Sequence, residues 1–253
     1  MKLAISNLAW NSSDLDILTN LVGMGVFNIE GVPTKIDHWD RLDVQSMVKF
    51  KHYLDIHSVE MPSMQSLFYQ TDCTSFFEQE HILAHFERLV SYCKILSTKI
   101  LVLGSPKLRT NAQDPYTKLA TLFSRLDSMI HGTGVTIVIE PNASIYGGSF
   151  FFTIQEIVEF IQENNLRNIR TMVDTHNSHL QLQDPIVEFN KYFEYISHIH
   201  ISECGLRPIE DSMFHRQFAK ALHQSTYAGI VTYEVLSCPN ILEEIQTFTR
   251  LYK

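Results

Sequence analysis

The chain has 253 residues, of which 45% are hydrophobic and 19% charged, with a formal net charge of -8. This length and composition suit one domain, 1–253, whose large core needs neither disulfides nor metal to fold, and the acidic balance disfavours a nucleic-acid partner. The four cysteines lack CxxC spacing, and no apolar run approaches the ~20 residues that span a bilayer. We therefore expect a cytoplasmic protein with reduced thiols and no membrane partner.

The first half of the chain alternates apolar strands with amphipathic helices. We predict strands at 2–8, 26–29, 59–67 and 99–103. The third is the weakest, because Pro62 and neighbouring serines dilute its β signal. Helices are predicted to run from an N-cap at Ser12, Ser13 or Asp14 to about 24, from Asp40 to 57, from Thr74 or Ser75 to 96, and from Asp114 to 131.

The second half repeats this alternation. Strands are predicted at 135–139, 170–173, 196–201 and 229–236. Helices are predicted from Thr153, which begins a capping-box-like Thr-x-x-Glu, from Asp184 to 195, from 213 to 224, and from Pro239 to the end. Strands and helices that alternate in this way over about 250 residues favour an α/β fold, a single (β/α)₈ TIM barrel. An open doubly wound sheet is the alternative, but its Gly-rich phosphate turn, GxGxxG or GxxxxGK[ST], is absent from the sequence.

Four polar residues fall at the ends of the last four predicted strands. They are Glu140, Asp174, His200 and Glu234. Strand ends converge at one mouth of a parallel barrel, where three carboxylates without a cation would raise one another's pKa values, so a divalent metal is expected. One imidazole and three carboxylates suit Mn²⁺ or Mg²⁺, with Co²⁺ and Zn²⁺ as alternatives. His198, on the same side of its strand but one layer deeper, is either a hydrogen-bonded core residue or a support for the site.

A family resemblance accompanies these residues. The segments that carry it, in chain order, are ISNLAW, EGVPTK, VLGSPKLR, IEPNASIYGGSF, VDTH, HIHISE and TYEVL. With them the chain resembles the xylose isomerase-like TIM barrels, in particular the sugar phosphate isomerase/epimerase branch, which includes ketose 3-epimerases and, more distantly, endonuclease IV. The resemblance implies a single metal ion held by Glu140, Asp174, His200 and Glu234, with the two glutamates also acting as acid and base. Mn²⁺ is the leading candidate for this ion.

The substrate-binding part of the family pattern is displaced in this chain. Family epimerases carry a substrate-binding His three residues after the metal-binding Asp, where this chain has Asn177 flanked by His176 and His179. They also carry an Arg six residues after the metal-binding His, where this chain has Leu206 and then Arg207. The metal site therefore transfers from the family more fully than the substrate contacts do.

Several residues on the same face are candidates for contacting a substrate. They are Trp10, Glu30, Lys107, Arg109, His176 and Glu203. Glu30 either receives a substrate hydroxyl or is an ordinary loop acid. Lys107 and Arg109 either hold a phosphate or carboxylate or are solvated loop cations. Trp10 either stacks on a sugar or packs at the barrel rim.

The expected function is a metal-dependent isomerase or epimerase of a small sugar, sugar phosphate or similar hydroxy-carbonyl compound. It would abstract a proton next to a carbonyl and pass through an enediolate. A metal-dependent lyase or dehydratase on a related polyol or keto acid uses the same first step and stays open, as does a non-catalytic binding barrel. A DNA nuclease is disfavoured by the acidic charge, and the sequence leaves a homo-oligomer open.

Overall fold

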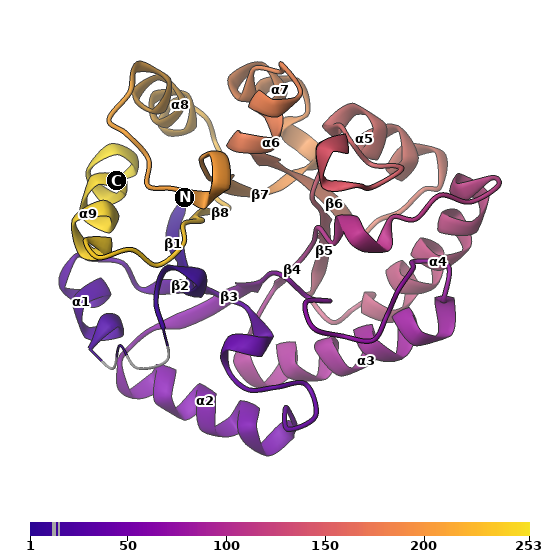
Figure 1. Cartoon of the computed structure of the whole chain (residues 1–253), viewed down its shortest axis with the longest axis horizontal. Coiled ribbons are helices and arrows are strands. Elements are labelled where there is room, and N and C mark those ends of the chain that lie inside the picture. The colour runs from indigo at the N-terminus through magenta and orange to yellow at the C-terminus, as the bar shows by residue number, and fades with distance from the viewer. Residues whose placement is uncertain (12–13, 15) are drawn as a thin grey trace.

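Parallel strands close into a barrel in sequential order, and helices cover its outer surface (Figure 1). The structure is a computed structural model that describes residues 1–11, 14 and 16–253. The strands are β1 (Lys2–Ser6), β2 (Asn28–Gly31), β3 (Glu60–Met64), β4 (Ile100–Leu103), β5 (Thr136–Ile139), β6 (Ile169–Asp174), β7 (Ile196–Ile201) and β8 (Ile230–Tyr233). Because β8 pairs with β1, the sheet has no free edge, and the predicted (β/α)₈ barrel is confirmed.

The helices follow the strands along the chain and form the outer ring of the barrel. They are α1 (Ile17–Gly23), α2 (Val44–Ile56), α3 (Gln79–Leu96), α4 (Pro115–Ile130), α5 (Ile154–Glu163), α6 (Thr175–Leu180), α7 (Pro185–Lys191), α8 (Met213–Gln224) and α9 (Ile241–Tyr252). Within the described part of the chain, none is long and apolar enough to cross a membrane. All four cysteines are free, as the sequence predicts.

Two apolar cores hold the layers together. The larger lies between the sheet and the helices and contains most of the buried side chains. The smaller consists of residues from alternating strand positions, namely Ala4, Ile100, Val102, Val138, Met172 and Ile230. Above this smaller cluster, towards the carboxyl ends of the strands, the fully buried residues are polar, and they include Glu30, His198, His200 and Thr232. The upper barrel interior is therefore a polar layer that needs internal partners.

Several element boundaries differ from the prediction, and for α2 the N-cap explains why. Asp43, not Asp40, caps α2, because its Oδ1 accepts from the Ser46 amide at 2.7 Å while the Ser46 hydroxyl accepts from the Asp43 amide at 2.8 Å. The predicted helix from Thr74 or Ser75 begins only at Gln79, and the last helix begins at Ile241, not Pro239.

The second half adds two further differences. The predicted helix to residue 195 ends at Lys191 and continues as a 3₁₀ turn at Phe193–Tyr195. The short helix α6 was not predicted; it forms because Asp174 caps it by accepting from the Asn177 amide at 2.7 Å. The N-cap positions Ser12 and Ser13 lie outside the described residues, and Asp14 accepts from the Asn11 amide instead of capping α1.

Candidate metal centre

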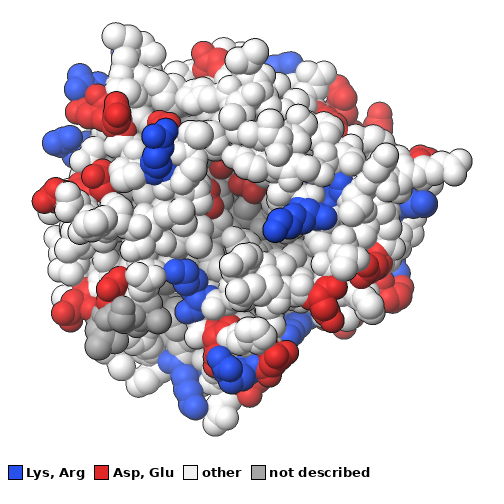
Figure 2. Space-filling model, viewed as in Figure 1, with Lys and Arg blue, Asp and Glu red and all other residues white. Residues whose placement is uncertain are grey.

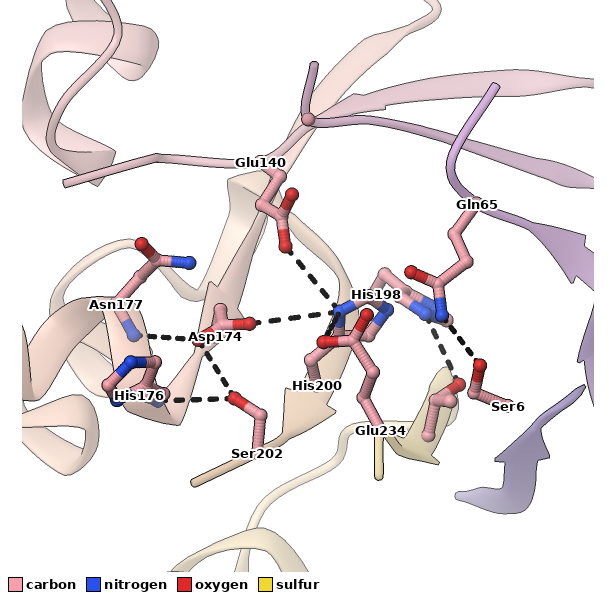
Figure 3. A network of polar contacts seen from close by, with 12 residues as sticks. Ser6, Gln65, Glu140, Asp174, His176, Asn177, His198, His200, Ser202 and Glu234 are labelled. Atoms are coloured by element: carbon pink, nitrogen blue, oxygen red, sulfur yellow. Dashed lines mark hydrogen bonds and ion pairs between the residues drawn. The ribbon is translucent and has the colours of Figure 1, made fainter. Parts of the chain in front are cut away.

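Four side chains meet at the carboxyl ends of β5 to β8. Ligand atoms of Glu140, Asp174, His200 and Glu234 all lie within 4.8 Å of one another (Figure 3). Their convergence follows from the closed parallel barrel, in which the carboxyl ends of neighbouring strands open on one mouth. The sequence prediction that these strand ends share one mouth holds, and this face of the molecule is hollowed at its centre, with acidic atoms visible inside (Figure 2).

His200 stands in the middle of this group. Its Nδ1 lies 3.5 Å from a carboxylate oxygen of Glu140, 3.8 Å from one of Asp174 and 3.5 Å from one of Glu234. This nitrogen is buried and has no hydrogen-bond partner among the described residues. The other ring nitrogen, Nε2, donates to Glu30 Oε1 at 2.8 Å, so Nδ1 is the nitrogen that can give up its proton and offer a lone pair to a metal ion.

The donor set therefore fits a divalent cation. A ring nitrogen with no hydrogen-bond partner among the described residues faces three carboxylates, and a buried carboxylate accepts from the nitrogen on the far side of the ring, the arrangement typical of metal-binding histidines. Three oxygen ligands and one nitrogen suit a hard or borderline divalent ion. The structure supports a metal site of this kind without specifying the ion.

Glu30 serves the interior of the barrel and does not face the mouth. Its side chain is completely buried, and its two oxygens lie 2.6 Å from His198 Nε2 and 2.8 Å from His200 Nε2. Both expectations for Glu30, a substrate contact and a solvated loop acid, are inconsistent with this placement. His198, whose Nε2 also lies 3.3 Å from the Thr232 hydroxyl, is the predicted deeper residue and reaches the site through Glu30.

Asp174 is held by neighbours that turn one oxygen toward His200. Its Oδ1 accepts from the Asn177 amide at 2.7 Å and from the Ser202 hydroxyl at 3.0 Å. Its Oδ2 is the atom that faces His200 Nδ1. Sequence reasoning missed Ser202, although its position two residues after His200 places it on the same face of the chain.

The carboxylates of this group outnumber its cationic side chains, and the pKa values of its members shift accordingly. Burial, together with repulsion by Glu140 and Glu234, raises the pKa of Asp174 to about 7. Burial opposes a charge on His200 as well, but Glu30 and Glu234 outweigh it and raise the pKa of His200 well above its ordinary value. For Glu30, the two histidines overcome the effect of burial and lower its pKa far below the ordinary value. A bound cation would supply the charge that the protein otherwise obtains from protons.

Arg109 is buried instead of lining the mouth. It is 1% exposed, and its described hydrogen bonds all go to main-chain carbonyl oxygens, with Gly104 and Glu140 at 2.7 Å and Phe151 at 2.8 Å. Burial lowers the pKa of Arg109 to about 10, so the guanidinium remains charged at neutral pH. The predicted anion-binding role does not fit this geometry; Arg109 ties the end of β4 to the end of β5 and the following loop.

Two other candidates remain on the rim. Lys107 is exposed in the 3₁₀ turn Pro106–Leu108 that follows β4. Trp10 is half-buried and lines a pocket beside β1 and β2 together with Lys35, whose Nζ donates to the Trp10 carbonyl at 3.0 Å. Their positions are compatible with substrate contact, which thus stays a prediction.

His176 lies in the first turn of α6, directly after β6, and Glu203 lies on the loop after β7. His176 Nε2 is 3.1 Å from the hydroxyl of Tyr146, which comes from the loop after β5. Asn177, at the position of the family histidine, accepts from the Ala143 amide at 3.0 Å and so has a structural partner. Glu203 accepts from Nε2 of the fully buried His215 at 3.0 Å. Tyr146 was not among the predicted residues. The available sequence signal was an aromatic residue in the segment that follows Glu140, and the structure shows that this residue is exposed.

The fold is a TIM barrel with a candidate metal centre at the carboxyl ends of its strands, and sequence comparison gives its family. Residues 22–251 match the family model described as xylose isomerase-like TIM barrel. The chain therefore belongs to that family, as its motifs suggest. Curated proteins give no significant match.

Solved structures with this fold include two epimerases and a probable dehydratase. A 3-keto-D-glucoside 4-epimerase, YcjR, from E. coli has a TM-score of 0.81 and 16% identity over 99% of both chains. A D-psicose 3-epimerase from Clostridium cellulolyticum H10, solved with D-tagatose, has a TM-score of 0.80 and 14% identity over 100% of both chains. A probable 3-DHS dehydratase, AsbF, from Bacillus anthracis has a TM-score of 0.69 and 13% identity, covering 99% of this chain and 98% of its own. At these identities the likeness shows the fold alone.

Proposed function

We propose that the chain is a divalent-metal-dependent epimerase or isomerase of a small sugar or a related hydroxy-carbonyl compound. The observation that carries the proposal is the unpartnered His200 Nδ1, which faces three carboxylates while Glu30 fixes the proton on the opposite nitrogen. Two epimerases of sugar-like substrates with the same fold over nearly the whole chain support the reaction class.

Glu140, Asp174, His200 and Glu234 would hold the ion, and the oxygen-rich set favours Mn²⁺. When bound, such a cation acts as a Lewis acid toward a carbonyl and its neighbouring hydroxyl, which acidifies the hydrogen on the carbon between them. Asp174 and His200 are the natural fixed ligands, because both are buried and both are held by further hydrogen bonds.

Glu140 and Glu234 are the proposed acid and base. Their side chains are 15% and 11% exposed, against 3% for Asp174 and 0% for His200, so they are the members of the group nearest the opening. They also follow different strands, β5 and β8, and reach the His200 ring from different directions in Figure 3. One glutamate can remove a proton from one face of a substrate carbon while the other returns a proton to the opposite face, which inverts that carbon.

Substrate contacts are proposed for the rim. Lys107 would hold an anionic or hydroxyl group, Trp10 would cover a sugar face, and His176 and Glu203 would complete the grip in place of the displaced family residues. This proposal leaves out Glu30 and Arg109, because both are buried away from the opening.

The test combines metal binding with hydrogen exchange. The purified protein is expected to gain thermal stability from Mn²⁺ and lose it with a chelator. With ketose substrates in deuterated water, the wild type should exchange the hydrogen next to the carbonyl. Glu140→Gln and Glu234→Gln should each abolish turnover while retaining at least part of the metal affinity, and one of them should still exchange from a single face.

Full activity in both variants would contradict the two-base scheme. Turnover without any solvent exchange would instead indicate a metal-assisted hydride shift. Glu163→Gln is the matched control, because Glu163 is exposed at the end of α5 and is not a member of the proposed site.

A dehydratase is the second candidate, because elimination begins with the same proton abstraction and a probable dehydratase shares the fold. Mass spectrometry of the products separates the two: an epimerase conserves the substrate mass, whereas a dehydratase releases water.

A further inference from the structure

The Glu140 carboxylate lies against the end of β4. Its Oε1 is the atom 3.5 Å from His200 Nδ1. Its Oε2 accepts from Asn142 Nδ2 at 3.2 Å and passes over Gly104, the residue that follows β4. The direction of the carboxylate therefore depends on the space available above residue 104.

Gly104 supplies that space. A Cβ atom at this position would lie 2.1 Å from Glu140 Oε2 and 3.4 Å from its Cδ, and the shorter distance is a steric overlap. Gly104 is not one of the glycines with a positive φ, so its backbone does not require glycine. Steric space, rather than conformation, is what distinguishes glycine from alanine here.

The surrounding backbone is tied so that it cannot separate to make room. Nη2 of the buried Arg109 donates to the Gly104 carbonyl and to the Glu140 carbonyl, each at 2.7 Å. The Glu140 amide also donates to the Leu103 carbonyl at 3.1 Å, which continues the pairing of β4 with β5. A side chain added at residue 104 would consequently displace the movable Glu140 carboxylate and leave the two strands in place.

We propose that Gly104 is a positioning residue of the metal centre, because its missing side chain is what lets the Glu140 carboxylate face His200. Arg109 fixes the distance between the two backbones and thereby makes the position sensitive to a single methyl group. The expected effect on metal binding rests on the proposed function. The orientation of Glu140, in contrast, can be measured without metal.

The experiment compares Gly104→Ala with Gly148→Ala. Gly148 is the matched control, since a Cβ there would meet Arg109 and Pro106 only at 3.4 to 3.5 Å, an ordinary contact. Gly104→Ala is expected to bind Mn²⁺ about 10- to 100-fold more weakly than the wild type, the usual cost of disturbing the support of a ligand. Its melting temperature in chelator should stay close to that of the wild type, because the overlap involves the free end of a side chain. Gly148→Ala should bind Mn²⁺ normally.

A crystal structure of chelator-treated Gly104→Ala supplies the second readout. Glu140 Oε1 should lie farther from His200 Nδ1 than the 3.5 Å of the wild type. An unchanged carboxylate position, unchanged Mn²⁺ affinity or failure to fold would each overturn the inference, the last because it would mean that the backbone collides. A wild type that does not bind Mn²⁺ would contradict the proposed function, while the position of Glu140 in the two crystal structures would still decide the role of Gly104.

Discussion

At the scale of single residues, the site depends on one carboxylate that a substrate does not reach. Glu30 holds two imidazoles in a completely buried layer, and the partner of its Oε1, His200, is 170 residues away in the sequence. Removing one partner from a buried charged group is costly, because the remaining groups lose their hydrogen bonds without regaining water. Glu30 therefore influences both stability and the ligand tautomer of His200.

We predict that Glu30→Ala lowers the free energy of unfolding by about 3 kcal/mol, the range for an uncompensated buried pair. Glu30→Gln should fold better but bind Mn²⁺ at least about 10-fold more weakly, since a neutral amide holds the imidazole less firmly. Urea denaturation and Mn²⁺ titration measure the two effects. Glu60→Gln is the control, because Glu60 pairs with Lys2 on the surface and its side chain is 70% exposed. Wild-type affinity in Glu30→Gln would refute the tautomer argument.

At the scale of secondary-structure elements, the mouth is held together by connections between strand ends. Arg109 joins the ends of β4 and β5 to the loop that contains Phe151, which in turn leads into α5. Thr153 caps that helix as predicted, by accepting from the Glu156 amide at 3.1 Å. The Glu156 carboxylate, however, accepts from the amides of Phe151 and Phe152, each at 2.7 Å, so it orders the loop rather than closing a capping box.

We expect Arg109→Met to destabilise the fold by about 2 to 5 kcal/mol, because several buried carbonyls would lose their donor. Lys107→Met should leave stability unchanged, because Lys107 is exposed, and should raise KM if that lysine contacts substrate. Chemical denaturation and steady-state kinetics distinguish the two residues. Equal stability of both variants would contradict the structural role of Arg109 and would favour the earlier alternative, a solvated loop cation.

The sequence predicted the strand ends more accurately than the roles of the residues around them. Strand periodicity placed Asp174 and His200 on inward-facing positions, and the two now lie opposite each other in the register of β6 and β7. The sequence predicts a substrate contact for Glu30 and Arg109 because each lies at or after the end of a strand, where α/β barrels place their binding residues. Their actual partners come from distant strands or from main-chain carbonyls, which no local pattern encodes.

At the scale of the whole molecule, an acidic chain concentrates carboxylates in the mouth of its barrel. The pKa of Asp174 is about 7 in the folded protein against an ordinary value of 3.8, so the folded state binds more protons between these pH values. Stability from this group is present at low pH and is lost as the pH rises toward about 7. The raised pKa of His200 acts in the same direction at higher pH.

Relative to Asp174→Asn, the metal-free wild type should therefore lose thermal stability as the pH rises from about 5 to about 8, and Mn²⁺ should stabilise the wild type most at the upper end. Melting curves in chelator and in Mn²⁺ across this range measure both trends. Asp174→Asn, which cannot carry the charge, should flatten the chelator curve. A wild type whose pH trend in chelator equals that of Asp174→Asn would contradict the arrangement of charges described here.

The link between Glu30 and His200 also means that the proposed ligands and the residue that orients one of them lie in different halves of the chain. All four proposed ligands lie in the second half of the chain, between 140 and 234, whereas the carboxylate that sets the imidazole tautomer lies on β2. A nascent or partly folded chain with β5 to β8 in place would hold the ligands without their orientation. If the proposed metal site is correct, we expect high-affinity metal binding to be a late event in folding, and it would then report that the two halves of the barrel have joined.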